Sequence, residues 1–166
     1  MDLSVRPATP ADHAAVLALN LEAEALMSPM DSARLRALDA QSVYHRVVCD
    51  GEAAIAFLLA FDERADYDSP NYLWYRQRYP RFVYIDRIAV AASHRNRRIG
   101  GLLYDDLFAF ARGRGFDTVA AEFYIVPFNE ASSRFHARYG FGEVGTQWLA
   151  GGAKQVSLQV ARIASR

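Results

Sequence analysis

The clearest chemical signal in the sequence is a basic, glycine-ended turn between a predicted strand at residues 82–90 and a predicted helix at 102–112. Backbone N–H groups at the start of a helix lack partners inside the helix and carry the positive end of its dipole. Glycines let an anion approach such a backbone closely, and arginines pair with phosphate oxygens. The turn therefore predicts a pyrophosphate site, with a solvated basic turn as the alternative. The residues concerned are Arg95, Asn96, Arg97, Arg98, Ile99, Gly100 and Gly101.

A second motif lies on a predicted helix from Asn129 to Gly140, which follows a predicted strand at 118–126. The two motifs together resemble those of the GNAT superfamily of N-acetyltransferases. The first matches the acyl-CoA signature Arg/Gln-x-x-Gly-x-Gly/Ala, with an arginine in place of its middle glycine. The second has the family's asparagine, small residue and Gly-Phe, with histidine where tyrosine is common, as in a bacterial subgroup. The matching positions are Arg95, Arg98, Ile99 and Gly100, then Asn129, Ser132, His136, Gly140 and Phe141.

The resemblance implies an acyltransferase (EC 2.3.1.-) that uses acetyl-CoA. In this family the strand before the turn splays from its neighbour and pairs with the pantetheine arm, which assigns backbone contacts to Ile88, Ala89 and Val90. It also places Asn129, Ser132 and Phe135 at the cofactor. The implied reaction is direct attack of a primary amine, from a small molecule or a peptide, on the thioester. A non-catalytic acyl-CoA sensor of the same fold is the alternative, because the usual tyrosine is missing.

Proton transfer has several candidate residues. His136 stands at the position of the family's thiolate-protonating tyrosine, and a histidine donates readily near neutral pH. Tyr139, one helical turn further, is the second candidate acid. Asp86 is the candidate base, and strand alternation predicts it on the face of Ile88 and Val90, opposite Arg87 and Ala89. The alternatives are a packed histidine and an Asp86–Arg87 pair. Glu122, on the next strand, shows no signal beyond chance.

The acceptor pocket is assigned to two regions. Residues 66–80 mix aromatic, acidic and amide side chains without a clear period, which predicts an ordered loop with one helical turn. Rings with a polar tip suit pocket walls, although they also serve to cover a sheet. Acidic members favour a cationic amine. The candidates are Asn20, Glu22, Met30, Tyr67, Asp68, Asn71, Tyr72 and Trp74.

The remaining elements complete a mixed α/β (α+β) fold. Strands are predicted at 3–6, 42–49, 53–61, 141–148 and 153–163, and helices near 12–23 and 31–38. The expected architecture is a GNAT-like twisted, mostly antiparallel sheet of about seven strands with about four helices on its faces. Residues 1–166 are predicted to form one acetyltransferase domain.

Composition excludes several other classes. Formal net charge is +0 and the pI is about 6.9, which argues against a nucleic-acid partner. The longest apolar run, 53–61, is too short to span a membrane, and the N-terminus has no signal-peptide pattern. One cysteine rules out an internal disulfide, and four histidines without ligand spacing predict no metal. We therefore expect a cytoplasmic enzyme, with a homodimer as an open option.

Overall fold

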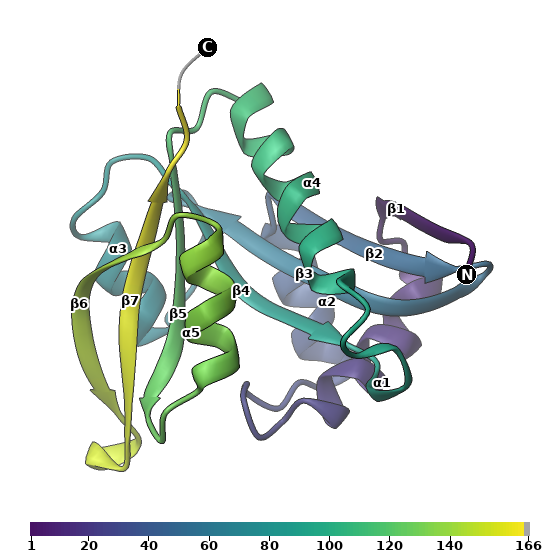
Figure 1. Cartoon of the computed structure of the whole chain (residues 1–166), viewed down its shortest axis with the longest axis horizontal. Helices are drawn as coiled ribbons and strands as arrows, with labels where there is room; N and C mark the ends of the chain where they lie inside the picture. The colour runs from purple at the N-terminus through teal and green to yellow at the C-terminus, as the bar shows by residue number, and fades with distance from the viewer. Residues whose placement is uncertain (165–166) are drawn as a thin grey trace.

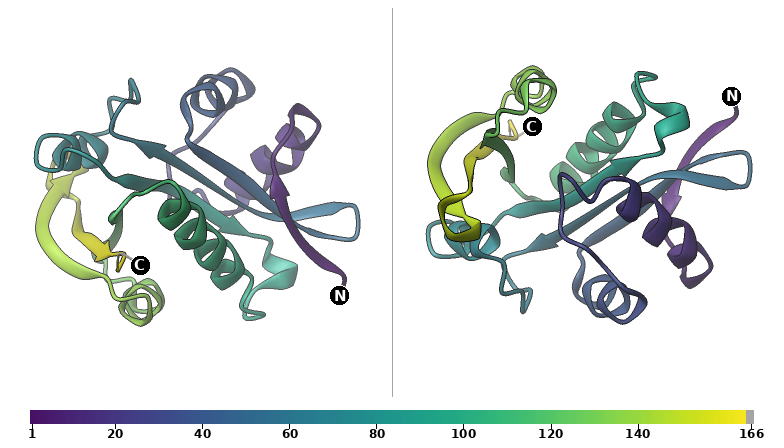
Figure 2. Two further views of the ribbon diagram at one scale, coloured as in Figure 1. Left: turned by 90° about the horizontal axis from the view of Figure 1, so that it is seen from above. Right: turned by 90° about the horizontal axis from the view of Figure 1, so that it is seen from below.

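The computed structural model describes residues 1–164 as one seven-stranded sheet with helices on both faces (Figures 1 and 2). The strands are β1 (Leu3–Pro7), β2 (Tyr44–Asp50), β3 (Ala53–Asp62), β4 (Val83–Val90), β5 (Thr118–Val126), β6 (Gly142–Leu149) and β7 (Lys154–Arg162). The helices are α1 (His13–Glu22), α2 (Ser32–Gln41), α3 (Pro70–Arg76), α4 (Ile99–Gly113) and α5 (Glu130–Arg138). Short 3₁₀ turns are η1 (Pro10–Asp12), η2 (Ala92–His94) and η3 (Ala150–Gly152).

The sheet has the order β1-β2-β3-β4-β5-β7-β6, and every neighbouring pair is antiparallel except β4 and β5. Those two parallel strands pair only at Val83 with Val119 and at Tyr84 with Ala120, and then diverge. Beyond this point the facing edges of β4 and β5 have no strand partner. The mixed α/β fold is therefore as predicted, and the central strands splay as the family resemblance implies.

Each face of the sheet buries its own apolar core. Helices α1, α2 and α3 cover one face, where Phe57, Phe61 and Tyr72 are fully buried. Helices α4 and α5 cover the other, where Leu103 and Leu107 of α4 are fully buried (Figure 2). Each such side chain contributes about 1.5–3 kcal/mol relative to exposure. None of the described helices is long and apolar enough to cross a membrane.

Two elements differ from the sequence prediction. Residues 66–80 contain a seven-residue helix, α3, where a loop with one turn was expected. Pro70 starts this helix, because proline suits a first helical position where no N–H partner is needed. Helix α4 begins at Ile99, three residues before the predicted start. Gly100 and Gly101 hide that start in the sequence, since glycine is a poor helix former.

Candidate active site

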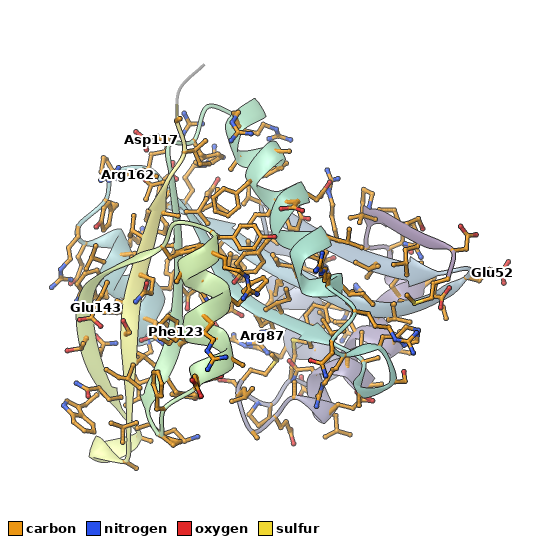
Figure 3. The ribbon with its side chains drawn as sticks, viewed as in Figure 1. Glu52, Arg87, Asp117, Phe123, Glu143 and Arg162 are labelled. Carbon is orange, nitrogen blue, oxygen red and sulfur yellow. The ribbon has the colours of Figure 1, made fainter. Side chains whose placement is uncertain are left out.

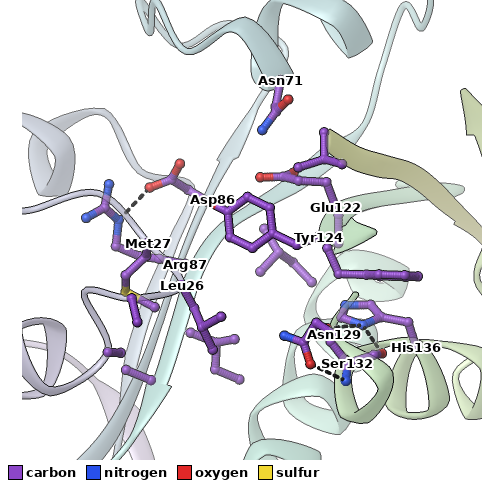
Figure 4. Close-up of a pocket in the computed structure, with 18 of the residues that line it drawn as sticks. Leu26, Met27, Asn71, Asp86, Arg87, Glu122, Tyr124, Asn129, Ser132 and His136 are labelled. Carbon is purple, nitrogen blue, oxygen red and sulfur yellow. Dashed lines mark hydrogen bonds and ion pairs between the residues drawn. The ribbon is translucent and has the colours of Figure 1, made fainter. Parts of the chain in front are cut away.

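A cavity of about 530 Å³ fills the opening between the diverging strands β4 and β5 (Figure 4). Arg87 of β4 and Phe123 of β5 lie on the two strands that form its walls (Figure 3). Further lining comes from the segment after α1, from Asn71 of α3, from Tyr104 of α4 and from Ser132 and His136 of α5. A cavity at the point where neighbouring strands separate is a common place for a ligand, because main-chain groups there lack sheet partners.

The start of α4 has backbone donors that no described part of the chain uses. Within residues 1–164, the N–H groups of Ile99, Gly100 and Gly101 make no hydrogen bond, and Arg98 provides no side-chain cap. Helices α2 and α5 differ, because Asp31 and Asn129 cap their first turns through side-chain oxygens. Helix α4 therefore keeps its N-terminal donors for an external acceptor such as a phosphate.

Arg98 explains how a non-glycine residue fits the signature's middle position. Its φ of 61° and ψ of 22° are in the left-handed region, which favours glycine. The side chain is exposed, so its bulk lies in solvent. The backbone thus keeps the turn that a glycine would form, and the substitution leaves the amides of α4 accessible.

The predicted cofactor residues separate into two groups. Ile88, Ala89, Val90, Arg95, Asn129 and Ser132 line the cavity, whereas Asn96, Arg97, Arg98, Ile99, Gly100, Gly101 and Phe135 do not. Ile99 is almost fully buried in the core under α4. Phe135 packs against Tyr104 with ring centroids 4.7 Å apart. Side-chain contact with a cofactor is therefore not supported for Ile99 or Phe135.

A β-bulge at Asp86 overturns the predicted alternation along β4. Leu59 pairs with Arg87 and Ala60 with Ile85, so Asp86 is the extra residue. In a regular strand neighbouring side chains point to opposite faces, but a bulge changes this. Here Arg87 Nε donates to Asp86 Oδ2 over 2.7 Å, and both side chains are about 95% buried. Asp86 also accepts from the hydroxyl of Tyr67 at 2.7 Å. The predicted base is therefore held in a buried ion pair at the cavity wall.

Glu122 on β5 has the properties of a catalytic base. Tyr84 donates to its Oε1 over 2.9 Å, while its buried Oε2 has no hydrogen-bond partner among the described residues. Burial, together with the nearby negative charge of Asp86, raises the pKa of Glu122 to about 8. It lines the cavity near Asn71 (Figure 4). The sequence does carry a signal for it, because Glu122 is the only charged residue in the apolar strand β5.

His136 is a buried, neutral member of the cavity wall. Its Nδ1 lies 2.8 Å from the Ser132 carbonyl oxygen, which can only accept, so Nδ1 carries a proton. In the neutral ring Nε2 then accepts from the hydroxyl of Tyr104, 2.8 Å away. Burial lowers the pKa of His136. The geometry therefore favours a neutral His136 that accepts from Tyr104, and its role as the acid stays a prediction.

Tyr139 does not line the cavity. Its hydroxyl donates to the carbonyl oxygen of Gly101 at 3.0 Å and to Asp105 at 2.9 Å, which fixes α5 against α4. Burial and the bond to Asp105 raise its pKa to about 12. These contacts place its hydroxyl outside the cavity lining, and its role as the second candidate acid stays a prediction.

Most of the predicted acceptor residues belong to the core or to the surface. Only Glu22 and Asn71 line the cavity. Tyr72 is fully buried and donates to the carbonyl of Asp62, and Tyr67 supports Asp86. Asp68 is exposed and faces Arg34. Asn20, Met30 and Trp74 also lie outside the cavity lining. Asn20 and Met30 contact Arg87, whereas Trp74 stacks with Arg78 and lies under Gly145.

Several lining residues were missed by the sequence analysis. The segment between α1 and α2 contributes Ala23, Ala25, Leu26 and Met27, and the sheet and helix α4 contribute Tyr104, Phe123, Tyr124, Leu149 and Val156. The segment between α1 and α2 has no motif of its own. Its position depends on Arg87, whose Nη1 donates to Asn20 Oδ1 at 3.1 Å and to the Ser28 carbonyl at 3.2 Å. Such a long-range contact leaves no pattern in the local sequence.

Comparisons with known proteins agree with this geometry. The acetyltransferase (GNAT) family model matches residues 16–141. Among solved structures, the ribosomal-protein-S18-alanine N-acetyltransferase from Escherichia coli is 13% identical with a TM-score of 0.76, covering 99% of this chain and 96% of that one. Arabidopsis thaliana NAA60, solved in complex with acetyl-CoA, is 18% identical with a TM-score of 0.75, covering 97% and 99%. No curated protein sequence matches the chain.

Two features of the site suit the co-substrate of this family. The uncapped start of α4 and the open edge of β4 can hold the diphosphate and the pantetheine amides of acetyl-CoA. That co-substrate supplies an acetyl group activated as a thioester. Because the family model covers most of the chain, we conclude that the protein belongs to the GNAT family of acetyltransferases and is an acyltransferase that uses acetyl-CoA.

Proposed function

We propose that the protein is an N-acetyltransferase whose acceptor is a primary amine and whose catalytic base is Glu122. One observation carries the proposal: the cavity, which Arg95 lines just before the uncapped start of α4, also contains a buried carboxylate with an oxygen that lacks a hydrogen-bond partner among the described residues. The first feature suits the acyl donor and the second suits a proton-bearing acceptor. A sensor of acyl-CoA would need the first feature only.

The base is needed because an alkylamine with a pKa near 10.4 is almost entirely protonated at neutral pH. Glu122, with its pKa near 8, takes a proton from the ammonium group more readily than an ordinary carboxylate does. We assign this step to Oε2, the buried oxygen that makes no hydrogen bond among the described residues. The neutral amine then attacks the thioester carbon, and backbone N–H groups on the free edge of β4 stabilise the oxyanion.

Departure of the thiolate makes a smaller demand on the protein. A thiol has a pKa near 8.5, so its anion is a moderate leaving group and needs no strong acid. We assign His136 and Tyr104 to the wall that positions the reacting groups, because the histidine is neutral and both are held in one hydrogen bond. Replacing His136 with Asn is accordingly expected to lower kcat by less than replacing Glu122 with Gln.

The acceptor is a small-molecule or peptide amine. Structural neighbours include NAA60 in complex with a bisubstrate analogue and the NatC complex bound to Gag peptide and CoA. These neighbours support a peptide, although their identity to this chain is low. The open side of the cavity beside Leu26, which is 56% exposed, leaves room for an acceptor larger than the amine itself.

The test combines binding and turnover. Calorimetry and thermal shift with acetyl-CoA are expected to show saturable binding below millimolar concentration, and thiol release is expected with members of a panel of amines and peptides. Binding without turnover on any acceptor would favour the sensor. Absence of binding at millimolar acetyl-CoA would sink the proposal.

A further inference from the structure

The acceptor end of the cavity contains a chemical restriction on the group beside the amine. Resting on the proposed function, we infer that the enzyme accepts amines whose neighbouring carbon carries no negative charge. Free α-amino acids are thereby excluded, whereas their amides, peptides with a free amino terminus and simple alkylamines are accepted. The inference depends on how the charges of the cavity are distributed.

The charged lining residues divide between the two ends of the cavity. Arg95 and Glu22 belong to the cofactor end: Arg95 precedes α4, and Glu22 accepts from the backbone N–H of Ala92 at 3.1 Å. Asp86, Arg87 and Glu122 belong to the other end, where β4 and β5 diverge. Lys154 lies 5.1 Å over the ring of Tyr124 and lines a smaller cavity of about 240 Å³, which shares Leu26 and Tyr124 with the main cavity.

The positive charge of Arg87 is already used inside the protein. Its Nε donates to Asp86, and its Nη1 donates to the Ser28 carbonyl, to Asn20 Oδ1 and, at 3.7 Å, to Met30 Sδ. Its side chain is only 4% exposed. The Asp86–Arg87 pair is therefore electrically neutral as a unit, and its geometry is fixed by the segment between α1 and α2.

Glu122 has no such cation beside it. Its described partner is the hydroxyl of Tyr84, and its Oε2 is unpaired. When Glu122 acts as a base, this end of the cavity carries one uncompensated negative charge in a partly dehydrated site. The carboxylate of a free amino acid is two bonds from the amine nitrogen, so it would lie within a few ångströms of Glu122. Like charges at that distance repel strongly where water is excluded.

The cavity wall next to Asp86 and Glu122 is apolar, and this guides the choice of test amines. Leu26 and Met27 line one side, and Leu149 and Val156 line the other. An acceptor with a branched aliphatic side chain suits such a wall. L-leucine, L-leucinamide and 3-methylbutylamine share this side chain and differ only in the group beside the amine: a carboxylate, a neutral amide or a hydrogen.

The experiment measures kcat/KM for the three amines, each expressed per concentration of unprotonated amine. Leucinamide and 3-methylbutylamine are expected to be acetylated, and leucine to be on the order of 100-fold slower. Leucine within threefold of leucinamide overturns the inference, as does the absence of turnover with all three in protein that binds acetyl-CoA. Failure to bind acetyl-CoA would count against the proposed function instead.

Two variants test the cause of the discrimination. Glu122→Gln is expected to reduce the leucinamide-to-leucine ratio at least tenfold, although both reactions become slower. Asp86→Asn leaves the Arg87 charge unpaired and is expected to raise kcat/KM for leucine relative to leucinamide. Glu52→Gln removes the same charge at the distant β2–β3 turn (Figure 3) and is expected to keep the wild-type ratio. An unchanged ratio in both cavity variants overturns the electrostatic explanation.

Discussion

The turn before α4 and the acceptor end of the cavity are built by opposite means. At the start of α4 the protein offers backbone donors that it leaves uncapped, surrounded by exposed arginines. At the divergence of β4 and β5 it offers side chains from different elements, most of them buried and hydrogen-bonded to one another. The first arrangement binds an anion that many enzymes share. The second can discriminate among acceptors, because it presents side chains of differing charge and shape to the acceptor.

The largest expected effect is a loss of acetyl-CoA affinity from a substitution at the start of α4. Gly100→Glu places a carboxylate beside the free amides of α4 and is expected to weaken acetyl-CoA binding by at least about 100-fold. The fold should tolerate it, because a Cβ at Gly100 meets nothing closer than Ile88 at 3.9 Å. Calorimetry and thermal melting measure the two properties. Gly113→Glu, at the other end of α4, is the control and should retain affinity; equal affinity in both variants would show that the helix start is not the site.

The next largest effect is a fall in kcat from a substitution at the acceptor end of the cavity. Glu122→Gln keeps the hydrogen bond from Tyr84 but removes the base, so kcat is expected to fall by about 10²–10³-fold while the Kd for acetyl-CoA changes less than twofold. In the wild type kcat should rise with pH until Glu122 is ionised, near pH 8. The variant should lack this rise. A variant with the wild-type pH profile would assign the base to another residue.

The difference between the two ends also decides what the sequence can predict. The strands, the hairpins and the basic turn before α4 depend on local pattern, namely alternation, glycines and the arginines at 95–98, and these were predicted, although α4 itself begins three residues earlier than expected. The bulge at Asp86 was not, because it depends on how β4 pairs with Leu59 and Ala60 of β3. Simple strand alternation therefore placed Asp86 on the wrong face of the sheet, with Ile88 and Val90.

The same reasoning applies to the aromatic residues of 66–80 and to Glu122. Tyr72 and Tyr75 have polar tips that suit a pocket, yet their hydroxyls satisfy buried carbonyls of Asp62 and Ala121. Those acceptors are 10 and 46 residues away, so the sequence gives no sign of them. Glu122 was assigned no role beyond chance in the sequence analysis. Only the splay between β4 and β5 shows that it faces a cavity.

A third prediction concerns the pH dependence of the free energy of unfolding, which the buried Glu122 should produce. Folded protein keeps the Glu122 proton up to about pH 8, whereas an unfolded chain releases it near the ordinary value of 4.5. Between these values the folded state binds more protons, so the free energy of unfolding falls as pH rises. The loss is on the order of 5 kcal/mol above pH 8 if Glu122 stays dehydrated. Urea unfolding at pH 5 and pH 9 measures it, and Glu122→Gln should remove most of the difference. An equal pH dependence in the variant would contradict the raised pKa.

The smallest expected effect concerns the backbone at the cofactor end. Arg98 holds a left-handed conformation at a cost of about 1 kcal/mol, which glycine avoids. Arg98→Gly is therefore expected to raise the free energy of unfolding by a few tenths of a kcal/mol, after the greater entropy of an unfolded glycine is subtracted. The neighbouring Arg97 has no positive φ, so Arg97→Gly should instead destabilise by about 0.5–1 kcal/mol. Opposite signs for adjacent arginines would show that the turn geometry, not its charge, is what the signature glycine provides; a loss of stability in both variants would contradict this.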